Sequence, residues 1–248
     1  MKISVVTVCF NSERTIEQTL RSFLAQTHPH KEMIVVDGLS RDRTLDIVNS
    51  FRSPDILVVS EKDAGIYDAM NKGLNLYSGD AVGFLNSDDA YHDEHALARI
   101  AGALQSADAV FGDILMVADH VSKTPVRTWK GAPFRKGSFR WGWMPAHPTF
   151  YARRELVDAV GTFRLDYRIA ADYDFMLRAL ETCPSKAEYI PHTLVDFMHG
   201  GSSTAGWRAV WRSNIESLKS RQQHLGAPSV DLAFVLKPGR KIFQLHWR

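Results

Sequence analysis

The sequence is poor in the features that mark secreted and membrane-spanning proteins. Its 248 residues include only two cysteines, Cys9 and Cys183, which cannot form a disulfide framework or, alone, a zinc site. No apolar run approaches the roughly 18 residues that a membrane helix needs. The apolar run after Lys2 ends at Asn11, which is too early for a signal peptide. We therefore expect a protein of the reducing cytoplasm.

The composition excludes two further classes of protein. The chain is 45% hydrophobic and 23% charged, with only 16 glycines and 10 prolines, so it is neither disordered nor collagen-like. A length of 248 residues suits one large α/β domain, alone or with a small appendage.

Strand-like and helix-like segments alternate through the first third of the chain. Short apolar runs predict strands over 3–10, 33–36, 56–59 and 81–85, and the first two have the uninterrupted pattern of buried parallel strands. Apolar residues at helical spacing predict helices between them, over 13–26, 42–51 and 64–77. This βαβαβαβ order predicts an α/β fold with a mostly parallel, Rossmann-related sheet flanked by helices.

The pattern changes after about residue 105 and predicts a smaller, mixed region. We expect short strands over 109–113, 125–129, 148–152 and 194–198, and helices over 172–182 and 207–224. The residues after the last helix, 226–248, have the pattern of a loosely attached tail.

Polar residues follow each of the first four predicted strands. One such residue is often only a turn former or helix cap, but ligands of open parallel sheets gather where strands end. The residues are Asn11, Asp37, Glu61, Asp63, Asn86, Asp88 and Asp89. The sequence has no glycine-rich dinucleotide or P-loop motif to cradle phosphates. A mononucleotide held by carboxylates and Mn²⁺ or Mg²⁺ therefore fits better.

Four segments together resemble the family 2 glycosyltransferases: Ile3–Asn11, Val35–Thr44, Glu61–Gly73 and Phe84–Asp89. The resemblance implies a GT-A fold and an inverting, metal-dependent transfer of a hexose-like sugar from a nucleotide-diphosphate sugar, with a UDP-sugar as the expected donor. The segment Glu61–Gly73 is similar to the bacterial branch that builds cell-surface polysaccharides. A glycan or polyprenyl-diphosphate-linked acceptor is therefore implied.

The resemblance also implies a division of the chain. Residues 1–204 would form the catalytic domain, and a basic helix and tail would follow over 205–248. Within the domain, residues 1–105 would bind the nucleotide-sugar and residues 106–204 the acceptor.

Donor contacts follow from the matching positions. The resemblance assigns Asp37 to the nucleotide base, and Thr7 and Asn11 to the base and ribose pocket. Asp63 would contact base or ribose; the alternative is a helix cap, and one side chain can fill both roles. Lys72 would approach the donor phosphates, or simply pair with a carboxylate four residues earlier on its helix.

The segment from Asn86 to Asp89 resembles the metal-binding DXD element of the family. Asn86 stands in place of the first aspartate, where its amide oxygen would contact ribose or a metal-bound water. Asp88 would be the direct metal ligand, and Asp89 would hold the metal's waters or the donor sugar. His199 precedes a Gly-Gly-x-Ser element and would be a further metal ligand.

The acceptor side carries the expected base. Asp172 matches the family's catalytic aspartate, although Ala171 replaces a glutamate beside it and Asp174 could compete for the role. Asp172 would accept the proton of the attacking hydroxyl. His147 would line the acceptor side, where a structural histidine is the alternative.

The formal net charge of +2 does not suggest nucleic-acid binding, but its distribution is uneven. Residues 120–154 contain eight basic residues and no Asp or Glu, and residues 207–248 contain eight against two acidic ones. Tryptophans lie in both regions. Such regions suit peripheral contact with the anionic inner face of a membrane, or a phosphate-bearing acceptor. A solvated basic surface without a partner is the alternative.

Two other functions stay open at this point. A nucleotidyltransferase shares a related architecture, although such enzymes usually begin with a glycine-rich phosphate loop. A non-catalytic subunit of a polysaccharide assembly complex is the other, because Asn86 and Ala171 depart from the family pattern. The Q-x-x-R-W motif of processive synthases is incomplete at Gly137–Trp141, which favours one sugar per encounter.

Overall fold

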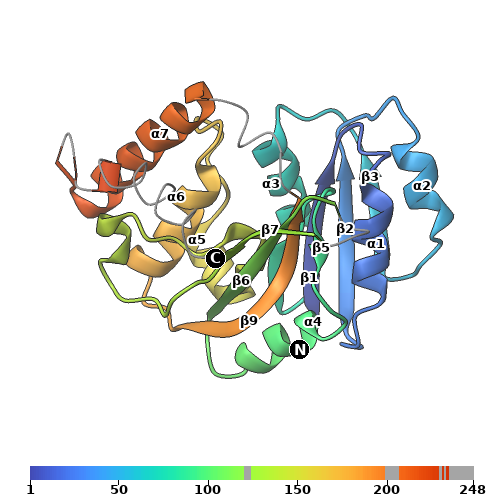
Figure 1. Ribbon diagram of the computed structural model, residues 1–248, viewed down its shortest axis with the longest axis horizontal. Coiled ribbons are helices and arrows are strands. Elements are labelled where there is room, and N and C mark those ends of the chain that lie inside the picture. Colours follow the sequence, from blue (N-terminus) through green and yellow to red (C-terminus); the bar gives the residue numbers. More distant parts are fainter. Residues whose placement is uncertain (120–123, 199–206, 229–230, 232, 235–248) are drawn as a thin grey trace.

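A computed structural model describes residues 1–119, 124–198, 207–228, 231 and 233–234. Its described residues form a nine-stranded sheet in the order β3-β2-β1-β4-β8-β6-β9-β5, with β7 beside β6 (Figure 1). The strands are β1 Ile3–Cys9, β2 Lys31–Asp37, β3 Ile56–Ser60, β4 Ala81–Phe84, β5 Ala90–Tyr91, β6 Ala109–Val117, β7 Pro125–Trp129, β8 Tyr151–Arg153 and β9 Ala187–Met198. The α-helices are α1 Ile16–Leu24, α2 Thr44–Ser50, α3 Ile66–Leu76, α4 Ala96–Ala103, α5 Arg154–Val160, α6 Ala171–Leu177 and α7 Trp207–Leu225.

The first half has the predicted alternation. β1 pairs in parallel with β2 and β4, and β2 pairs in parallel with β3. All seven residues of β1 are buried, because helices cover both faces of the sheet there. α3 lies especially close: a Cβ on Gly73 would come within 2.3 Å of Val6 Cγ1. Only glycine at this position lets the helix backbone approach β1 so closely.

The second half is mixed, and several of its elements differ from the predictions. The strand expected over 148–152 begins only at Tyr151, because Pro148 lies in a 3-10 turn over His147–Thr149. β9 is 12 residues long, and β5, α4 and α5 were not predicted. The helix expected over 172–182 is divided into α6 and a π-helical segment over Arg178–Thr182.

The C-terminal helix α7 lies beside α6, at the far end of the sheet from α1 and α2 (Figure 1). The side chain of Arg221 on α7 is 1% exposed and pairs with Asp231 at 2.5 Å. Breaking such a buried pair typically costs about 3–5 kcal/mol. Asp231 and Ala233 are buried, so the prediction of a loosely attached tail is wrong for these residues. The domain bounds stay a prediction.

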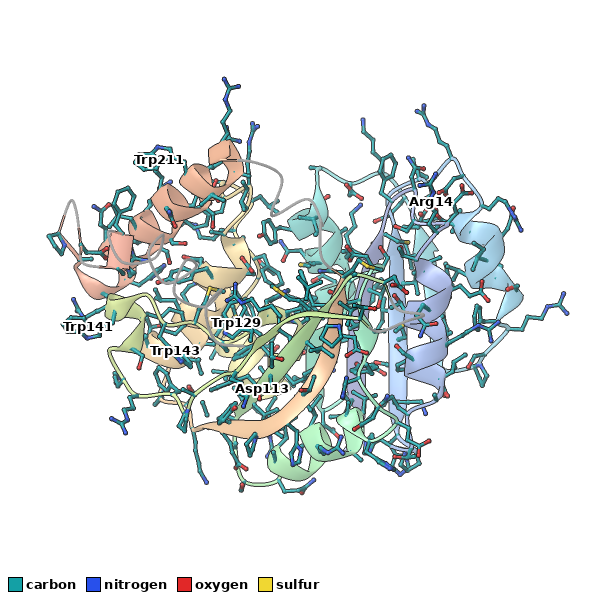
Figure 2. The ribbon with its side chains drawn as sticks, in the orientation of Figure 1. Arg14, Asp113, Trp129, Trp141, Trp143 and Trp211 are labelled. Atoms are coloured by element: carbon teal, nitrogen blue, oxygen red, sulfur yellow. The ribbon has the colours of Figure 1, made fainter. Side chains whose placement is uncertain are left out.

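The tryptophans separate into inner and outer positions. Trp143 packs against the core, whereas Trp141 and Trp211 are 57% and 54% exposed. Both exposed rings lie at the α7 end of the molecule (Figure 2). None of the helices in the described part of the chain is long and apolar enough to cross a bilayer.

Candidate functional site

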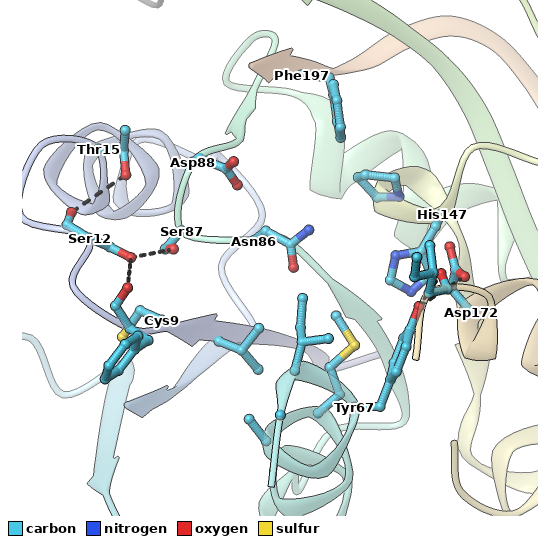
Figure 3. Close-up of a pocket in the computed structure, with 18 of the residues that line it drawn as sticks. Cys9, Ser12, Thr15, Tyr67, Asn86, Ser87, Asp88, His147, Asp172 and Phe197 are labelled. Atoms are coloured by element: carbon cyan, nitrogen blue, oxygen red, sulfur yellow. Dashed lines mark hydrogen bonds between the residues drawn. The ribbon is translucent and has the colours of Figure 1, made fainter. Parts of the chain in front are cut away.

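A cavity of about 880 Å³ opens where β1 and β4 end (Figure 3). The ends of these strands, the first turns of α3 and α6, and the turn before β8 all contribute to its wall. Parallel pairing of β1 with β4 explains this convergence, because both chains leave the sheet at the same edge.

Six of the predicted site residues line this cavity. They are Asn11, Asp63, Asn86, Asp88, His147 and Asp172. Thr7, Asp37, Lys72 and Asp89 do not line it, and His199 lies outside the described residues. The cavity therefore draws on both the predicted donor half and the predicted acceptor half of the chain.

Asp37 and Lys72 are occupied by contacts within the fold. Asp37 is fully buried and accepts hydrogen bonds from the Ser40 N–H at 3.1 Å and the Ser60 hydroxyl at 2.6 Å. Burial, followed by the charge of Asp37, raises the pKa of the neighbouring Cys9 thiol. The Lys72 ammonium pairs with Glu61 at 3.0 Å. In this structure both side chains serve the loops that frame the cavity.

Asn11 and Ser12 hydrogen-bond the loop after β1 to the loop after β2 and to the turn after β4. Asn11 has a φ of 51°, a left-handed conformation that asparagine tolerates better than most residues. Its side-chain oxygen accepts the Arg41 N–H at 2.9 Å. The Ser12 and Ser87 hydroxyls lie 2.9 Å apart, which joins this loop to the turn after β4. The sequence pointed to neither serine as a site residue, although Ser87 lies inside the DXD-like segment.

The turn after β4 directs its side chains in two directions. Asn86 and Asp88 face the cavity (Figure 3), and the amide oxygen of Asn86 is buried without a hydrogen-bond partner among the described residues. Asp89 points inward, is fully buried and accepts the Met198 N–H at 3.2 Å. Burial, then the charge of Asp88, raises the pKa of Asp89 well above its ordinary range. Asp89 therefore ties this turn to the end of β9.

Asp172 and Tyr67 meet on the opposite wall. The Tyr67 hydroxyl lies 2.6 Å from the Ile169 carbonyl and 3.2 Å from Asp172 Oδ1 (Figure 3). Burial, then the Asp172 carboxylate, raises the pKa of Tyr67, so this phenol stays protonated and can donate. Asp174 is fully buried and bonded to Arg178, so it is Asp172 that faces the cavity. Tyr67 lies within the motif Glu61–Gly73, which was the signal that could have found it.

His147 lines the cavity beside Asp172. Its ring stacks on Phe84 with centroids 5.5 Å apart, and its Nε2 has no hydrogen-bond partner within the described residues. Burial lowers the pKa of His147 below the ordinary 6.5, while Asp172 partly opposes the shift. The imidazole is therefore neutral at pH 7 and offers the cavity a nitrogen able to donate or accept.

The remaining wall is apolar and was not predicted. Its members come from β6, β7, β9 and the segment before β8, and they are Ile114, Met116, Trp129, Met144 and Phe197. The cavity thus has a polar end at the turns after β1 and β4, and an apolar wall built by the second half of the chain.

The family model for "Glycosyl transferase family 2" matches residues 4–165. The chain belongs to this family. This family 2 glycosyltransferase is 30% identical over 210 residues to a "PGL/p-HBAD biosynthesis glycosyltransferase" of Mycobacterium tuberculosis, covering 77% of this chain and 74% of the relative. It is 41% identical over 92 residues to the "Putative teichuronic acid biosynthesis glycosyltransferase TuaG" of Bacillus subtilis, covering 36% of each.

Solved structures have the same fold. The structure of Staphylococcus aureus TarS 1–349 in complex with UDP-GlcNAc matches with a TM-score of 0.70 at 21% identity, over 94% of this chain and 69% of TarS 1–349. Mannosyltransferase PcManGT of Pyrobaculum calidifontis, in complex with GDP-Man and Mn²⁺, matches with a TM-score of 0.66 at 19% identity, over 96% and 67%. These likenesses confirm the expected GT-A fold of this glycosyltransferase, and its family sets aside the nucleotidyltransferase alternative.

The shifted pKa of His147 predicts a pH-dependent stability. The pKa of His147 in the folded state lies below 6.5, so below that pH the unfolded chain binds more protons than the folded chain. The free energy of unfolding should therefore decrease as the pH falls from 6.5 toward the folded-state pKa. Urea unfolding between pH 5 and pH 7.5 measures this slope. The slope should be shallower in His147→Gln, and His30→Gln, on the surface, controls for loss of a histidine elsewhere. Equal slopes in wild type and His147→Gln would contradict a lowered pKa of His147 in the folded protein.

Proposed function

We propose that this family 2 enzyme inverts the anomeric configuration as it transfers a sugar from a nucleotide-diphosphate sugar, most simply a UDP-sugar, to an acceptor hydroxyl in bacterial surface polysaccharide synthesis. The observation that carries the proposal is that one cavity is lined by both Asp88 and Asp172. The similarity to the putative teichuronic acid biosynthesis glycosyltransferase TuaG supports the pathway class, and the likeness to TarS in complex with UDP-GlcNAc supports the donor class.

Asp172 acts as the general base. It takes the proton of the acceptor hydroxyl while the acceptor oxygen bonds to the anomeric carbon and the bond to the departing diphosphate breaks. One displacement of this kind inverts the anomeric centre, and no covalent enzyme intermediate forms. The Tyr67 hydroxyl, 3.2 Å from Asp172 Oδ1, orients the carboxylate. His147, neutral beside it, is placed to bond the acceptor or the donor sugar.

The turn after β4 fits a divalent cation. Asp88 supplies a carboxylate at the cavity, and Asn86 supplies a buried amide oxygen without a partner among the described residues. Hard oxygen donors of this kind suit Mn²⁺ or Mg²⁺. When bound, the cation would neutralise charge on the departing diphosphate. The described residues contain no group of three His, Cys, Asp or Glu side chains that could hold a metal ion by themselves, so diphosphate oxygens and water, or His199, would complete the shell.

The acceptor occupies the apolar wall. Trp129 and Phe197 offer aromatic surface at the cavity, which suits the apolar faces of a sugar ring or the body of an amphipathic acceptor. A lipid-linked acceptor also agrees with the exposed Trp141 and Trp211 at the α7 end. We propose peripheral contact of this end with an anionic membrane, where each nearby Lys or Arg contributes about 1 kcal/mol.

The role of the base is tested with Asp172→Asn. Loss of a general base lowers kcat on the order of 10²–10⁴-fold, whereas donor affinity should be unchanged because the amide keeps the shape of the side chain. Donor consumption, with acceptor or with water, measures kcat, and calorimetry with UDP measures affinity. Asp166→Asn, at an exposed ion pair outside the cavity, should behave as wild type. A parallel loss of UDP affinity would show that Asp172 binds rather than catalyses, and a wild-type protein that never consumes donor would favour the non-catalytic alternative.

The metal assignment is tested with Asp88→Ala. Wild-type protein should gain thermal stability from UDP only when Mn²⁺ is present, because a ligand that binds the folded state raises its stability. Asp88→Ala should lose both that gain and transfer, while its melting temperature without ligand stays near wild type. Asp55→Ala, which precedes β3 at the opposite edge of the sheet, is the control. Near-wild-type turnover in Asp88→Ala would refute the assignment.

The membrane proposal predicts salt-sensitive binding to anionic vesicles. Sedimentation with phosphatidylserine vesicles should fall steeply as salt rises, because exposed charges are screened beyond about 8 Å at physiological ionic strength. Reversing the exposed Arg135 and Lys136 to glutamate should weaken binding. Reversing Arg43 and Arg52, near α2 at the other end of the molecule, should not. Equal effects of both pairs, or no binding at low salt, would remove the membrane from the proposal.

A further inference from the structure

Helix α7 binds the segment before Asp172 through the carboxylate of Glu216. Glu216 Oε2 accepts the N–H groups of Ile169 and Ala170, each at 2.9 Å, and Oε1 accepts that of Arg168 at 3.1 Å. Three consecutive peptide N–H groups therefore converge on one side chain from another helix. Hydrogen bonds to an ionised acceptor are roughly twice as strong as neutral ones. Asp172 follows this segment by two residues.

The same segment is held from the other side by α3. The carbonyl of Ile169 accepts the Tyr67 hydroxyl at 2.6 Å, and this hydroxyl also lies 3.2 Å from Asp172 Oδ1. The peptide groups of Ile169 thus bond to Glu216 through their N–H and to Tyr67 through their C=O. Because Ile169 and Asp172 both line the cavity, this clamp sets the position of the cavity wall that carries the carboxylate.

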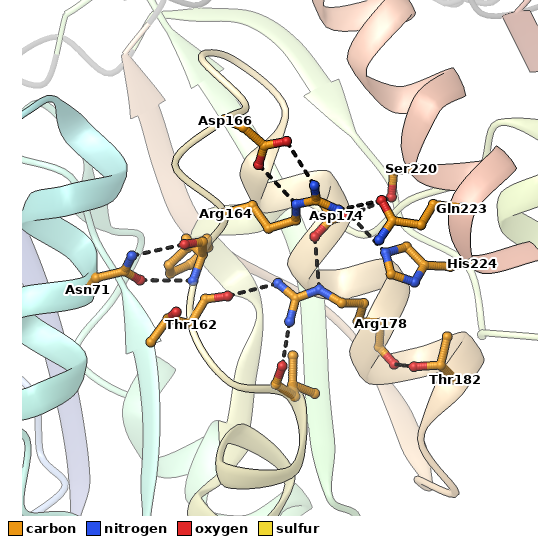
Figure 4. A network of polar contacts seen from close by, with 12 residues as sticks. Asn71, Thr162, Arg164, Asp166, Asp174, Arg178, Thr182, Ser220, Gln223 and His224 are labelled. Atoms are coloured by element: carbon orange, nitrogen blue, oxygen red, sulfur yellow. Dashed lines mark hydrogen bonds and ion pairs between the residues drawn. The ribbon is translucent and has the colours of Figure 1, made fainter.

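Further contacts fix α7 itself against α6. Ser220 and His224 follow Glu216 at intervals of four residues, so all three lie on one face of α7. The Ser220 hydroxyl donates to Asp174 Oδ1 at 2.7 Å, and His224 Nε2 lies 3.2 Å from the same oxygen (Figure 4). Asp174 is fully buried and also accepts from Arg178 at 2.8 Å. One face of α7 therefore contacts the chain on both sides of Asp172: residues 168–170 before α6, and Asp174 within α6.

We propose that α7 braces the catalytic carboxylate and that Glu216 is a positioning residue for Asp172. The proposal rests on the proposed function, in which Asp172 is the base. A base must lie within about 2.6–3.2 Å of the proton that it takes, and a misplacement of 1 Å can cost about 10²-fold in rate. Without Glu216, the three N–H groups would turn to water and the segment would lose its fixed orientation. Of the three residues whose N–H groups Glu216 binds, only Ile169 lines the cavity, so donor binding should not depend on Glu216.

Two variants separate positioning from folding. Glu216→Ala removes all three bonds, and we expect kcat to fall about 10²-fold with the affinity for UDP and Mn²⁺ unchanged. Glu216→Gln keeps one acceptor oxygen, which can still accept the N–H groups of Ile169 and Ala170. The NH₂ group of the glutamine would face the N–H of Arg168 and cannot accept it. We expect this variant to retain an intermediate kcat. Glu17→Ala, which breaks an exposed i,i+4 pair on α1, is the matched control and should behave as wild type.

Hydrogen exchange gives a readout that does not require activity. The amide protons of residues 168–170 should exchange faster in Glu216→Ala than in wild type, while those of β1 stay unchanged. A kcat within twofold of wild type in Glu216→Ala would overturn the brace and leave the proposed function intact. Parallel losses in melting temperature, UDP affinity and kcat would also overturn it, because they indicate a general structural role. A wild-type protein without transfer or donor hydrolysis would instead overturn the proposed function.

Discussion

The parallel pairing of β1 with its two neighbours is the constraint on which the site depends. β1 meets β2 up to Cys9 and Asp37, and meets β4 up to Val6 and Phe84, so the following loops emerge together at one edge of the sheet. Those loops then bond to one another through side chains such as Ser12 and Ser87. The backbone hydrogen bonds of three strands thereby fix the cavity before any ligand enters.

The sequence was most informative where structure is local. Uninterrupted apolar runs and apolar residues at helical spacing predicted β1 to β4 and the three helices between them, α1, α2 and α3. The pattern is plainest where a strand is buried on both faces, as in β1. The motifs also located Asn11, Asp63, Asn86, Asp88, His147 and Asp172, all of which line one cavity. Asn11, Asp63, Asn86 and Asp88 also follow predicted strands, whereas His147 and Asp172 were assigned only by the resemblance to the family.

The remaining features depend on contacts between distant parts of the chain. β8 is three residues long and pairs antiparallel with both β4 and β6, and nothing within so short a segment predicts its partners. Asp37 and Lys72 were predicted to contact the donor, and the structure shows them bonded to Ser60 and Glu61 and outside the cavity lining. A motif position alone does not give the direction of a side chain. Tyr67 meets Asp172 across 105 residues of sequence, and Glu216 meets Ala170 across 46. Pairs of this kind carry no local pattern.

The close approach of α3 to β1 at Gly73 has a consequence for the far end of that helix. α3 is a rigid rod of 11 residues, and Tyr67 lies at its first turn. A side chain at position 73 would collide with Val6 and displace α3 from the sheet. The displacement would also move the Tyr67 hydroxyl, which contacts Asp172. The position of the Tyr67 hydroxyl beside Asp172 thus depends in part on how closely α3 packs against β1 at Gly73 and Val6.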